Sequence, residues 1–324
     1  MRTGKDNEMS LRLGIDAGGT TIKLGLVNTG HEITHALDIP TAFDFEEAAR
    51  DIAAAVQELV KQAGVSLNDL PYIGIGVPST VRPDTGRVVL ANNTGWEDAP
   101  MKERLEELLG RPVRIANDAD CALAAEAAAG AARGQNNVLM VTLGTGVGGA
   151  MLLGGRLFSG CDGMGMEVGH MPLFADGRPC TCGAAGCLEA YASATGLIAL
   201  ACEQAQQHMG SALYTQTLTG QLDGKAIFDA AQAGDDTALL VVDTYTAWLA
   251  QGLGGLINIF RPDLILLGGG ISHAGDLLFD RVRALLPRFI LAHDVIGGPQ
   301  VVPALLGNPA GIIGAAFLQE VQGG

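Results

Sequence analysis

The sequence predicts an α/β fold of two lobes with a cleft between them. The chain has 324 residues, more than a single domain usually contains. Segments 11–27 and 137–153 share one plan, which is an apolar strand, a turn rich in Gly and Thr, and a second apolar strand. Predicted strands alternate with predicted helices along the rest of the chain. The recurring hairpin therefore indicates two halves of related architecture.

The elements follow from local signals. Asp44 lies three residues before Glu47 and predicts a capped helix start, and Gly64 predicts its stop. The further predicted elements are a strand at 72–77, a helix at 100–110, a strand at 113–116, a helix from about 118, helices near 187–207 and 235–259, a strand at 264–267, and helices near 276–287 and 309–321. We place the lobe boundary at Asp118, which gives a smaller lobe of residues 1–118 plus 305–324 and a larger lobe of residues 119–304.

Composition excludes several classes of protein. Hydrophobic residues make up 48% and charged residues 17% of the chain, as in ordinary folded proteins. The net charge of −15 repels a phosphate backbone, so we expect no nucleic-acid partner. No apolar run approaches the roughly 20 residues that span a bilayer, and the opening residues lack an apolar signal core. We expect a cytoplasmic protein with no membrane partner.

The turn DAGGTTIK (16–23) has the composition of a phosphate cradle. Gly18 and Gly19 let backbone amides approach an anion, and Thr20 and Lys23 add a hydroxyl and a positive charge. Asp16 is placed to hold Mg²⁺ near the phosphates. A tight hairpin with incidental polar residues is the alternative. The recurrence at 144–149 favours the cradle, and the spacing fits neither a P-loop nor a Rossmann turn.

Asp118 ends a predicted buried strand and begins an Ala-rich helix, in the segment IANDAD (115–120). A carboxylate at such an element end suits a general base that faces a cleft. The alternative is that Asn117 or Asp118 only caps the helix. The local sequence leaves both interpretations open.

Four potential metal ligands lie within eighteen residues of the segment 167–189. His170, Cys180, Cys182 and Cys187 are spaced by 10, 2 and 5 residues. Three thiolates and one imidazole fill a tetrahedral zinc site and leave no position for water, so the predicted ion is structural. Buried free cysteines and a core histidine are the alternative.

Two glutamates, Glu167 and Glu189, bracket these ligands. A loop held by zinc would present their carboxylates at fixed positions, which suits sugar hydroxyls. The alternative is that both are solvated surface acids.

Together these segments resemble the ROK family of bacterial repressors and sugar kinases, especially its glucokinase-like members. The resemblance covers nearly the whole chain and rests on 16–23, NTGW (93–96), 117–120, TLGTGVGG (142–149), EVGH (167–170), CTCGAAGCLE (180–189) and RPDLILLGGG (261–270). It implies the actin-like ATPase fold, a duplicated ribonuclease H-like architecture. It also implies phosphorylation of a hexose, with glucose as the expected substrate, at its 6-hydroxyl by Mg²⁺-ATP, a place in carbohydrate metabolism and glycolysis, and a homodimer or dimer of dimers.

The resemblance also assigns residues. Asp118 is the expected base, and the other expected sugar contacts are Asn93, Glu167, His170 and Glu189. The expected nucleotide contacts are Asp16, Gly18, Gly19, Thr20 and Lys23 in the first turn, Gly144, Thr145 and Gly146 in the second turn, and Gly254, Gly255, Gly269 and Gly270 on the adenosine side. The chain departs from the family pattern at Met166, where a small residue is common, and in having Asn92 beside Asn93.

Two other functions stay open. An N-acetylmannosamine or other hexose kinase differs from a glucokinase only in the shape of the sugar pocket. A sugar-sensing ROK-type transcriptional regulator would here lack its DNA-binding domain, since only ten residues precede Leu11, without a helical pattern or basic stripe. Retention of Asp118, Asp16 and Lys23 favours the enzyme.

Overall fold

The computed structural model describes residues 10–91 and 94–322, which divide into two compact units. The first unit comprises Met1–Asn136, Ala150–Met166 and Leu305–Gly324, and the second comprises Asn137–Gly149 and Glu167–Ala304. The division differs from the predicted boundary at Asp118 because the helix that begins there packs against the C-terminal helix and stays in the first unit.

The first unit is built on a five-stranded sheet of order β3-β2-β1-β4-β7. Strands β1, β2 and β3 pair antiparallel, and β1, β4 and β7 pair parallel. The elements of this unit are β1 (Arg12–Ala17), β2 (Thr21–Val27), β3 (Ile33–Pro40), α1 (Phe45–Gln62), η1 (Leu67–Asp69), β4 (Ile73–Val77), β5 (Val88–Ala91), β6 (Trp96–Ala99), α2 (Met101–Leu109), β7 (Val113–Asn117), α3 (Asp118–Ala129), β10 (Arg156–Leu157) and α11 (Ala310–Val321).

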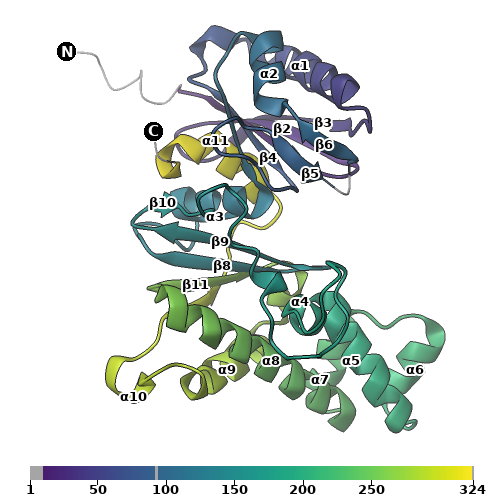
Figure 1. Cartoon of the computed structure of the whole chain (residues 1–324). Helices are drawn as coiled ribbons and strands as arrows, with labels where there is room; N and C mark the ends of the chain where they lie inside the picture. The colour runs from purple at the N-terminus through teal and green to yellow at the C-terminus, as the bar shows by residue number, and fades with distance from the viewer. Residues whose placement is uncertain (1–9, 92–93, 323–324) are drawn as a thin grey trace. The chain divides into compact units, whose positions relative to one another are not determined.

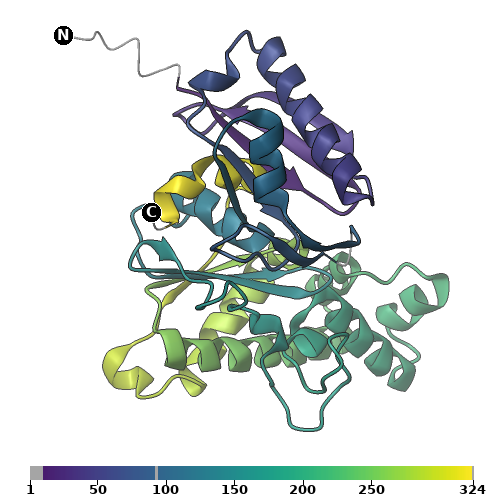
Figure 2. The ribbon, with the colours of Figure 1, turned by 45° about the horizontal axis from the view of Figure 1, so that its top comes forward.

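Helices cover both faces of this sheet. Helices α1 and α2 pack on one face, and α3 and α11 pack on the other (Figure 1). The turned view in Figure 2 shows α11, in yellow, directly beside α3. The backbone of α11 comes so close to the sheet that a Cβ atom at Gly14 would lie 1.9 Å from the carbonyl oxygen of Ile312, and one at Gly74 would lie 1.8 Å from that of Ala315. Glycine at these two strand positions is therefore a requirement of close packing.

The second unit contains a helical layer and most of a second five-stranded sheet, of order β10-β9-β8-β11-β12. The long helix α8 is central to the layer and contacts α4, α5, α6, α7 and α9. The elements are β8 (Val138–Leu143), β9 (Val147–Leu153), which crosses the division, η2 (Val168–His170), α4 (Glu189–Ala192), α5 (Ala194–Gln207), α6 (Ala212–Thr219), α7 (Gly224–Gln232), α8 (Asp236–Phe260), β11 (Leu264–Gly268), η3 (Gly270–Ala274), α9 (Asp276–Leu285), η4 (Leu286–Arg288), α10 (His293–Ile296) and β12 (Gln300–Pro303).

The two sheets share one plan, as the recurring hairpin predicted. Each has a hairpin whose first strand, β1 or β8, pairs with a parallel strand from later in the chain. A second parallel strand follows, β7 in one sheet and β12 in the other. The two Gly-rich turns therefore occupy equivalent places in two related sheets.

Most of the predicted elements are confirmed, and one helix was wrong. The helix expected near 187–207 is two helices, α4 and α5, because Ser193 caps a new start by accepting a hydrogen bond from the N–H of Gly196 at 3.0 Å. The expectations for α1, α2, α3, α8, α9, α11, β4, β7 and β11 hold to within about two residues. The elements that were not predicted include strands β3, β5, β6, β10 and β12 and helices α6, α7 and α10.

No helix in residues 10–91 and 94–322 combines the length and the apolar character needed to cross a lipid bilayer.

Candidate functional site

The turn between β1 and β2 brings the predicted phosphate-binding residues together. Asp16 and Lys23 are directly opposite partners of the antiparallel pair, and the N–H of Gly18 donates to the carbonyl oxygen of Thr21 at 3.0 Å. Burial raises the pKa of Asp16, and the charge of Lys23 opposes this effect. The turn thus holds a carboxylate and an ammonium at the carboxyl end of β1, beside Gly18, Gly19 and Thr20.

Two residues that the sequence did not indicate support this turn. Thr41 donates its hydroxyl to the carbonyl oxygen of Gly18 at 2.7 Å and its N–H to that of Thr20 at 3.0 Å. Gly311, in the first turn of α11, lies against Asp16, and a Cβ atom there would be 2.5 Å from the carboxyl carbon. The carboxylate is therefore held close to the N-terminal end of α11, where the helix dipole favours negative charge.

Asp118 is the first residue of α3, and its side chain is exposed. The N-cap of this helix is Asn117, whose Oδ1 accepts a hydrogen bond from the N–H of Ala119 at 2.8 Å. Asp118 Oδ1 accepts from the same N–H, also at 2.8 Å. Asn117 and Asp118 therefore share this N–H, and the helix start has an acceptor besides Asp118.

Asp16 and Asp118 both lie where the parallel strands of the first sheet have their carboxyl ends. Strands β1, β4 and β7 are parallel neighbours, so their carboxyl ends lie side by side. Asp16 lies near the end of β1 and Asp118 directly after β7, with only β4 between them, which corresponds to a separation on the order of 10 Å across the sheet. In open α/β sheets ligands bind at this carboxyl edge. Asn93, the remaining sugar contact expected in this part of the chain, lies outside the described residues, as does Asn92.

In the second unit, the turn between β8 and β9 is attached to Glu189. The N–H of Val147 donates to Glu189 Oε2 at 3.0 Å, and a Cβ atom at Gly146 would lie 2.4 Å from the same oxygen. The N–H of Ala194 donates to the carbonyl oxygen of Gly144 at 2.8 Å, and the hydroxyl of Thr195 donates to that of Thr145 at 3.0 Å. The start of α5 therefore fixes this turn. The sequence did not indicate this attachment.

The predicted metal ligands converge in the second unit. One donor atom from each of His170, Cys180, Cys182 and Cys187 lies within 4.8 Å of the others. Cys182 Sγ is 3.7 Å from Cys187 Sγ, and Cys180 Sγ is 3.7 Å from His170 Nδ1. Tetrahedral Zn–S bonds of about 2.3 Å would place two sulfur atoms about 3.8 Å apart. The donor set and its spacing therefore fit a zinc ion.

Glu189 also contacts the loop of residues 180–187, which carries the three cysteines and is called the metal-ligand loop below. The hydroxyl of Thr181 donates to Glu189 Oε1 at 3.3 Å, while Oε2 accepts from Val147 in the Gly-rich turn. One carboxylate thus connects the loop and the turn. Glu167, the other expected acid, is exposed and immediately precedes η2, and its carbonyl oxygen accepts the N–H of His170 at 3.0 Å.

The thiols of this loop differ in acidity. Burial raises the pKa of Cys187 to about 12, whereas a backbone hydrogen bond from Ala184 lowers the pKa of Cys182. A metal ion binds thiolates, so its binding must release protons from this loop.

A cavity of about 400 Å³ lies next to the expected adenosine side, between α7 and η3. Gly270, Lys225, Phe228 and His273 contribute to its lining. Gly269, with φ of 82°, makes the turn from β11 into η3. Gly254 and Gly255 lie within α8 instead and do not line this cavity.

The chain belongs to the ROK family, whose pattern it matches over residues 12–321. It is 39% identical to a glucokinase of Halalkalibacterium halodurans over 96% of this chain and 95% of that protein. It is 35% identical to a glucokinase of Thermotoga maritima over 96% of this chain and 98% of that protein.

Solved structures agree with this membership. The crystal structure of a ROK family glucokinase from Streptomyces griseus, in complex with glucose and AMPPNP, superposes with a TM-score of 0.78 at 33% identity. The similarity covers 95% of this chain and 98% of that one. The fold is therefore the actin-like ATPase fold of the ROK sugar kinases.

Proposed function

We propose that this protein is an ATP-dependent glucokinase, which transfers the γ-phosphoryl group of ATP to the 6-hydroxyl of glucose. The full-length similarity to glucokinases supports the reaction class. The exposed carboxylate of Asp118, at the carboxyl edge of the first sheet, is the observation that carries the chemistry.

In this proposal Asp118 accepts the proton of the 6-hydroxyl as the oxygen attacks the γ-phosphorus. The P–O bond to ADP breaks, and ADP leaves with its electron pair. A positioned base typically contributes about 10²- to 10⁴-fold to such a step. The rest of the barrier is lowered by positioning the reactants and by neutralising charge on the phosphates.

The two Gly-rich turns would supply that neutralisation. Lys23 and the amides of Gly19 and Thr20 suit phosphate oxygens, as do those of Thr145 and Gly146. The N–H groups of Gly18 and Gly144 close the two turns, since they donate to the carbonyl oxygens of Thr21 and Gly146 at 3.0 Å. Asp16 is the carboxylate of the set that would hold Mg²⁺, a hard cation that prefers oxygen ligands. The cavity at Gly270 suits the adenosine of ATP in position and size.

The sugar would be bound by Asn93, Glu167, His170 and Glu189 together with Asp118. We propose that a structural Zn²⁺ held by His170, Cys180, Cys182 and Cys187 fixes the loop that carries these groups. Glu189 also accepts the N–H of Val147 in the second Gly-rich turn. The same carboxylate would therefore contact both the sugar and the turn proposed to bind phosphate.

We also propose a homodimer that uses the second unit. Ile259, Leu291 and Val295 expose 68%, 77% and 84% of their surface. Hydrogen bonds between Asn258 and both Phe289 and Leu291 hold these segments together. Light scattering should report twice the chain mass, and Val295→Asp should reduce it.

A coupled assay with Mg²⁺-ATP tests the function. Glucose should give the highest kcat/KM among glucose, mannose, fructose, N-acetylglucosamine and N-acetylmannosamine. Asp118→Ala should lower kcat by about 10²- to 10⁴-fold and leave glucose binding in calorimetry largely intact. Near-normal turnover of that variant would show that another group is the base. A higher kcat/KM with an N-acetylated sugar would replace glucose as the substrate.

A further inference from the structure

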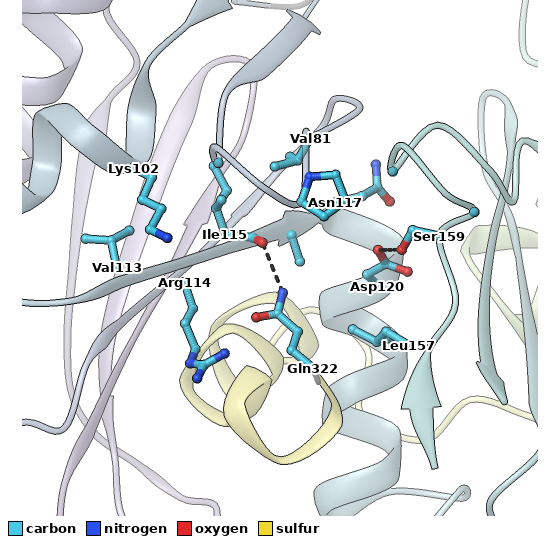
Figure 3. Close-up of a pocket in the computed structure, with 15 residues that line it drawn as sticks. Val81, Lys102, Val113, Arg114, Ile115, Asn117, Asp120, Leu157, Ser159 and Gln322 are labelled. Carbon is cyan, nitrogen blue, oxygen red and sulfur yellow. Dashed lines mark hydrogen bonds between the residues drawn. The ribbon is translucent and has the colours of Figure 1, made fainter. Parts of the chain in front are cut away.

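A cavity of about 290 Å³ lies along β7, the edge strand of the first sheet (Figure 3). We call it the β7-edge pocket. The polar side chains that line it belong to Lys102, Arg114, Asn117, Asp120, Ser159 and Gln322. Asp118 and the turn of Asp16–Lys23 do not contribute to its lining. Among residues 10–91 and 94–322, none of those assigned above to sugar or nucleotide lines the pocket.

One end of the pocket is cationic. Lys102 of α2 and Arg114 of β7 are half-buried, and neither forms an ion pair within residues 10–91 and 94–322. The alkyl chain of Lys102 packs over Gly86, where a Cβ atom would lie 2.5 Å from Lys102 Cβ, and the Arg114 guanidinium lies 5.7 Å from the ring centre of Tyr72. In a chain of net charge −15, two partly desolvated cations without a carboxylate partner indicate an anion as their partner.

The other end is polar and carries an acid. Ser159 donates its hydroxyl to Asp120 Oδ2 at 3.2 Å, and Asp120 is buried. Figure 3 shows these two side chains with Asn117 on the side of the pocket away from Lys102 and Arg114, and Gln322 between the two ends. Carboxylate, hydroxyl and amide groups offer both donors and acceptors, which suits ligand hydroxyls. The Asp120 carboxylate would repel a phosphate, so an anionic group belongs at the opposite end.

We propose that the β7-edge pocket binds a small phosphorylated polyol of the hexose 6-phosphate type. Its phosphate would lie between Lys102 and Arg114, and its hydroxyls would lie toward Asn117, Asp120 and Ser159. The volume of 290 Å³ is at the lower limit of about 300 Å³ for ligand pockets, which suits one sugar ring. The choice of a hexose phosphate rests on the proposed function, whose product is of this class.

Occupancy would act on the start of α3. Asn117 caps this helix through the N–H of Ala119, and its Nδ2 donates to the carbonyl oxygen of Ser79 at 3.2 Å. The next residue is Asp118. A ligand that draws on the Asn117 amide therefore changes how firmly the proposed base is positioned, which makes the pocket a site of regulation by product.

Calorimetry with glucose 6-phosphate tests the site. Titrations contain saturating glucose, so that the substrate site is filled. Lys102→Gln and Arg114→Gln should each weaken binding by at least about ten-fold, because each removes a charge-assisted contact to the phosphate. Arg133→Gln removes an exposed cation of the same unit that is not one of the lining residues, and should leave the affinity unchanged. Lys102→Gln keeps the first methylene groups of the side chain, which pack over Gly86, so the test does not depend on whether Arg114→Gln folds.

Inorganic phosphate serves as the remaining probe. It should bind the pocket at least about ten-fold more weakly than glucose 6-phosphate, and equal affinity would overturn the polyol assignment. Unchanged glucose 6-phosphate affinity in Lys102→Gln would overturn the site itself. A wild type that phosphorylates no glucose but binds glucose 6-phosphate with this lysine dependence would refute the proposed function and support the pocket.

Discussion

Glu126 Oε1 accepts a hydrogen bond from the backbone N–H of Leu305 at 2.7 Å, across 179 positions of sequence. The same oxygen accepts the N–H of Leu306 at 2.9 Å, and Oε2 accepts that of Ala131 at 2.7 Å. Glu126 is fully buried in α3. Its carboxylate thus ties the helix that begins at Asp118 to the segment with which the chain returns to the first unit.

We expect Glu126→Gln to destabilise the protein by about 2 kcal/mol, because the amide NH₂ cannot accept and would face a backbone N–H donor inside the fold. Chemical denaturation followed by circular dichroism measures the loss. Glu103→Gln, an exposed position on α2, is the matched control and should show no measurable change. Equal stabilities of the two variants would contradict the role given to Glu126.

Asp16 should make stability depend on pH. Burial raises its pKa in the folded chain, so the stability it contributes is present at low pH and is lost as the pH rises through the folded-state pKa. Asp16→Asn stays neutral and should be more stable than the wild type at pH 7, with a difference that vanishes below the ordinary carboxyl pKa of about 3.9. The same variant should lose at least about 10²-fold in kcat.

Thermal unfolding between pH 3.5 and pH 8 measures this difference. Asp38→Asn is the control. Asp38 is exposed on β3 and pairs with Lys23 of β2 on the strand side opposite to Asp16. A gain of equal size in both variants would show that the effect does not come from the burial of Asp16.

Removing one thiolate should release the metal and loosen its loop. Cys182→Ser should lower bound zinc from about one ion per chain to near none, raise KM for the sugar and reduce stability. Metal affinity should also fall as the pH falls, because protons compete for the thiolates. Elemental analysis measures the zinc content, and Cys161→Ser, an exposed cysteine outside the ligand set, should leave it unchanged.

Trp248 gives a readout that does not depend on activity. Its ring centre is 5.0 Å from that of Tyr191 and 6.5 Å from that of Phe174, whose N–H donates to the carbonyl oxygen of Gly186 next to Cys187. Chelation should therefore change tryptophan emission in the wild type. An unchanged spectrum together with full sugar affinity in a zinc-free preparation would refute the structural role of the metal.

Gly146→Ala should displace Glu189, because the new Cβ atom would lie 2.4 Å from Oε2. The carboxylate can swing away at little cost in stability, but its hydrogen bond with Val147 would be lost. We expect kcat/KM for the sugar to fall by about ten-fold or more. Gly144→Ala is the control, because its new Cβ atom would lie in open space, and it should leave KM for the sugar unchanged. An equal sugar KM in the two variants would refute the role of Glu189.

Much of the fold was predictable because its signals are local. The helix from 45 is marked by Asp44, which accepts the N–H of Glu47, and the strand at Leu264–Gly268 is an uninterrupted apolar run. Strand β3 was missed because it is an edge strand without a fully buried residue, so its alternation of half-buried and exposed side chains is weak. The break at Ser193 was missed because a single cap residue inside an apolar pattern does not stop the helical periodicity.

The sequence by itself determined the chemistry that lies within short segments. The spacing of His170, Cys180, Cys182 and Cys187 predicted a metal site, and one turn carries both Asp16 and Lys23. A short loop can bring its own residues together without the rest of the fold. Such groups are therefore visible as motifs.

Only the tertiary structure decided the relationships between distant segments. It joined Glu126 to Leu305, placed Gly311 against Asp16, and formed the β7-edge pocket from α2, β7, α3 and the end of α11. These contacts arise because the C-terminal helix packs beside α3 on a sheet assembled from separate parts of the chain. No spacing in the sequence encodes them, since their geometry exists only after the sheet has closed and the helix has docked.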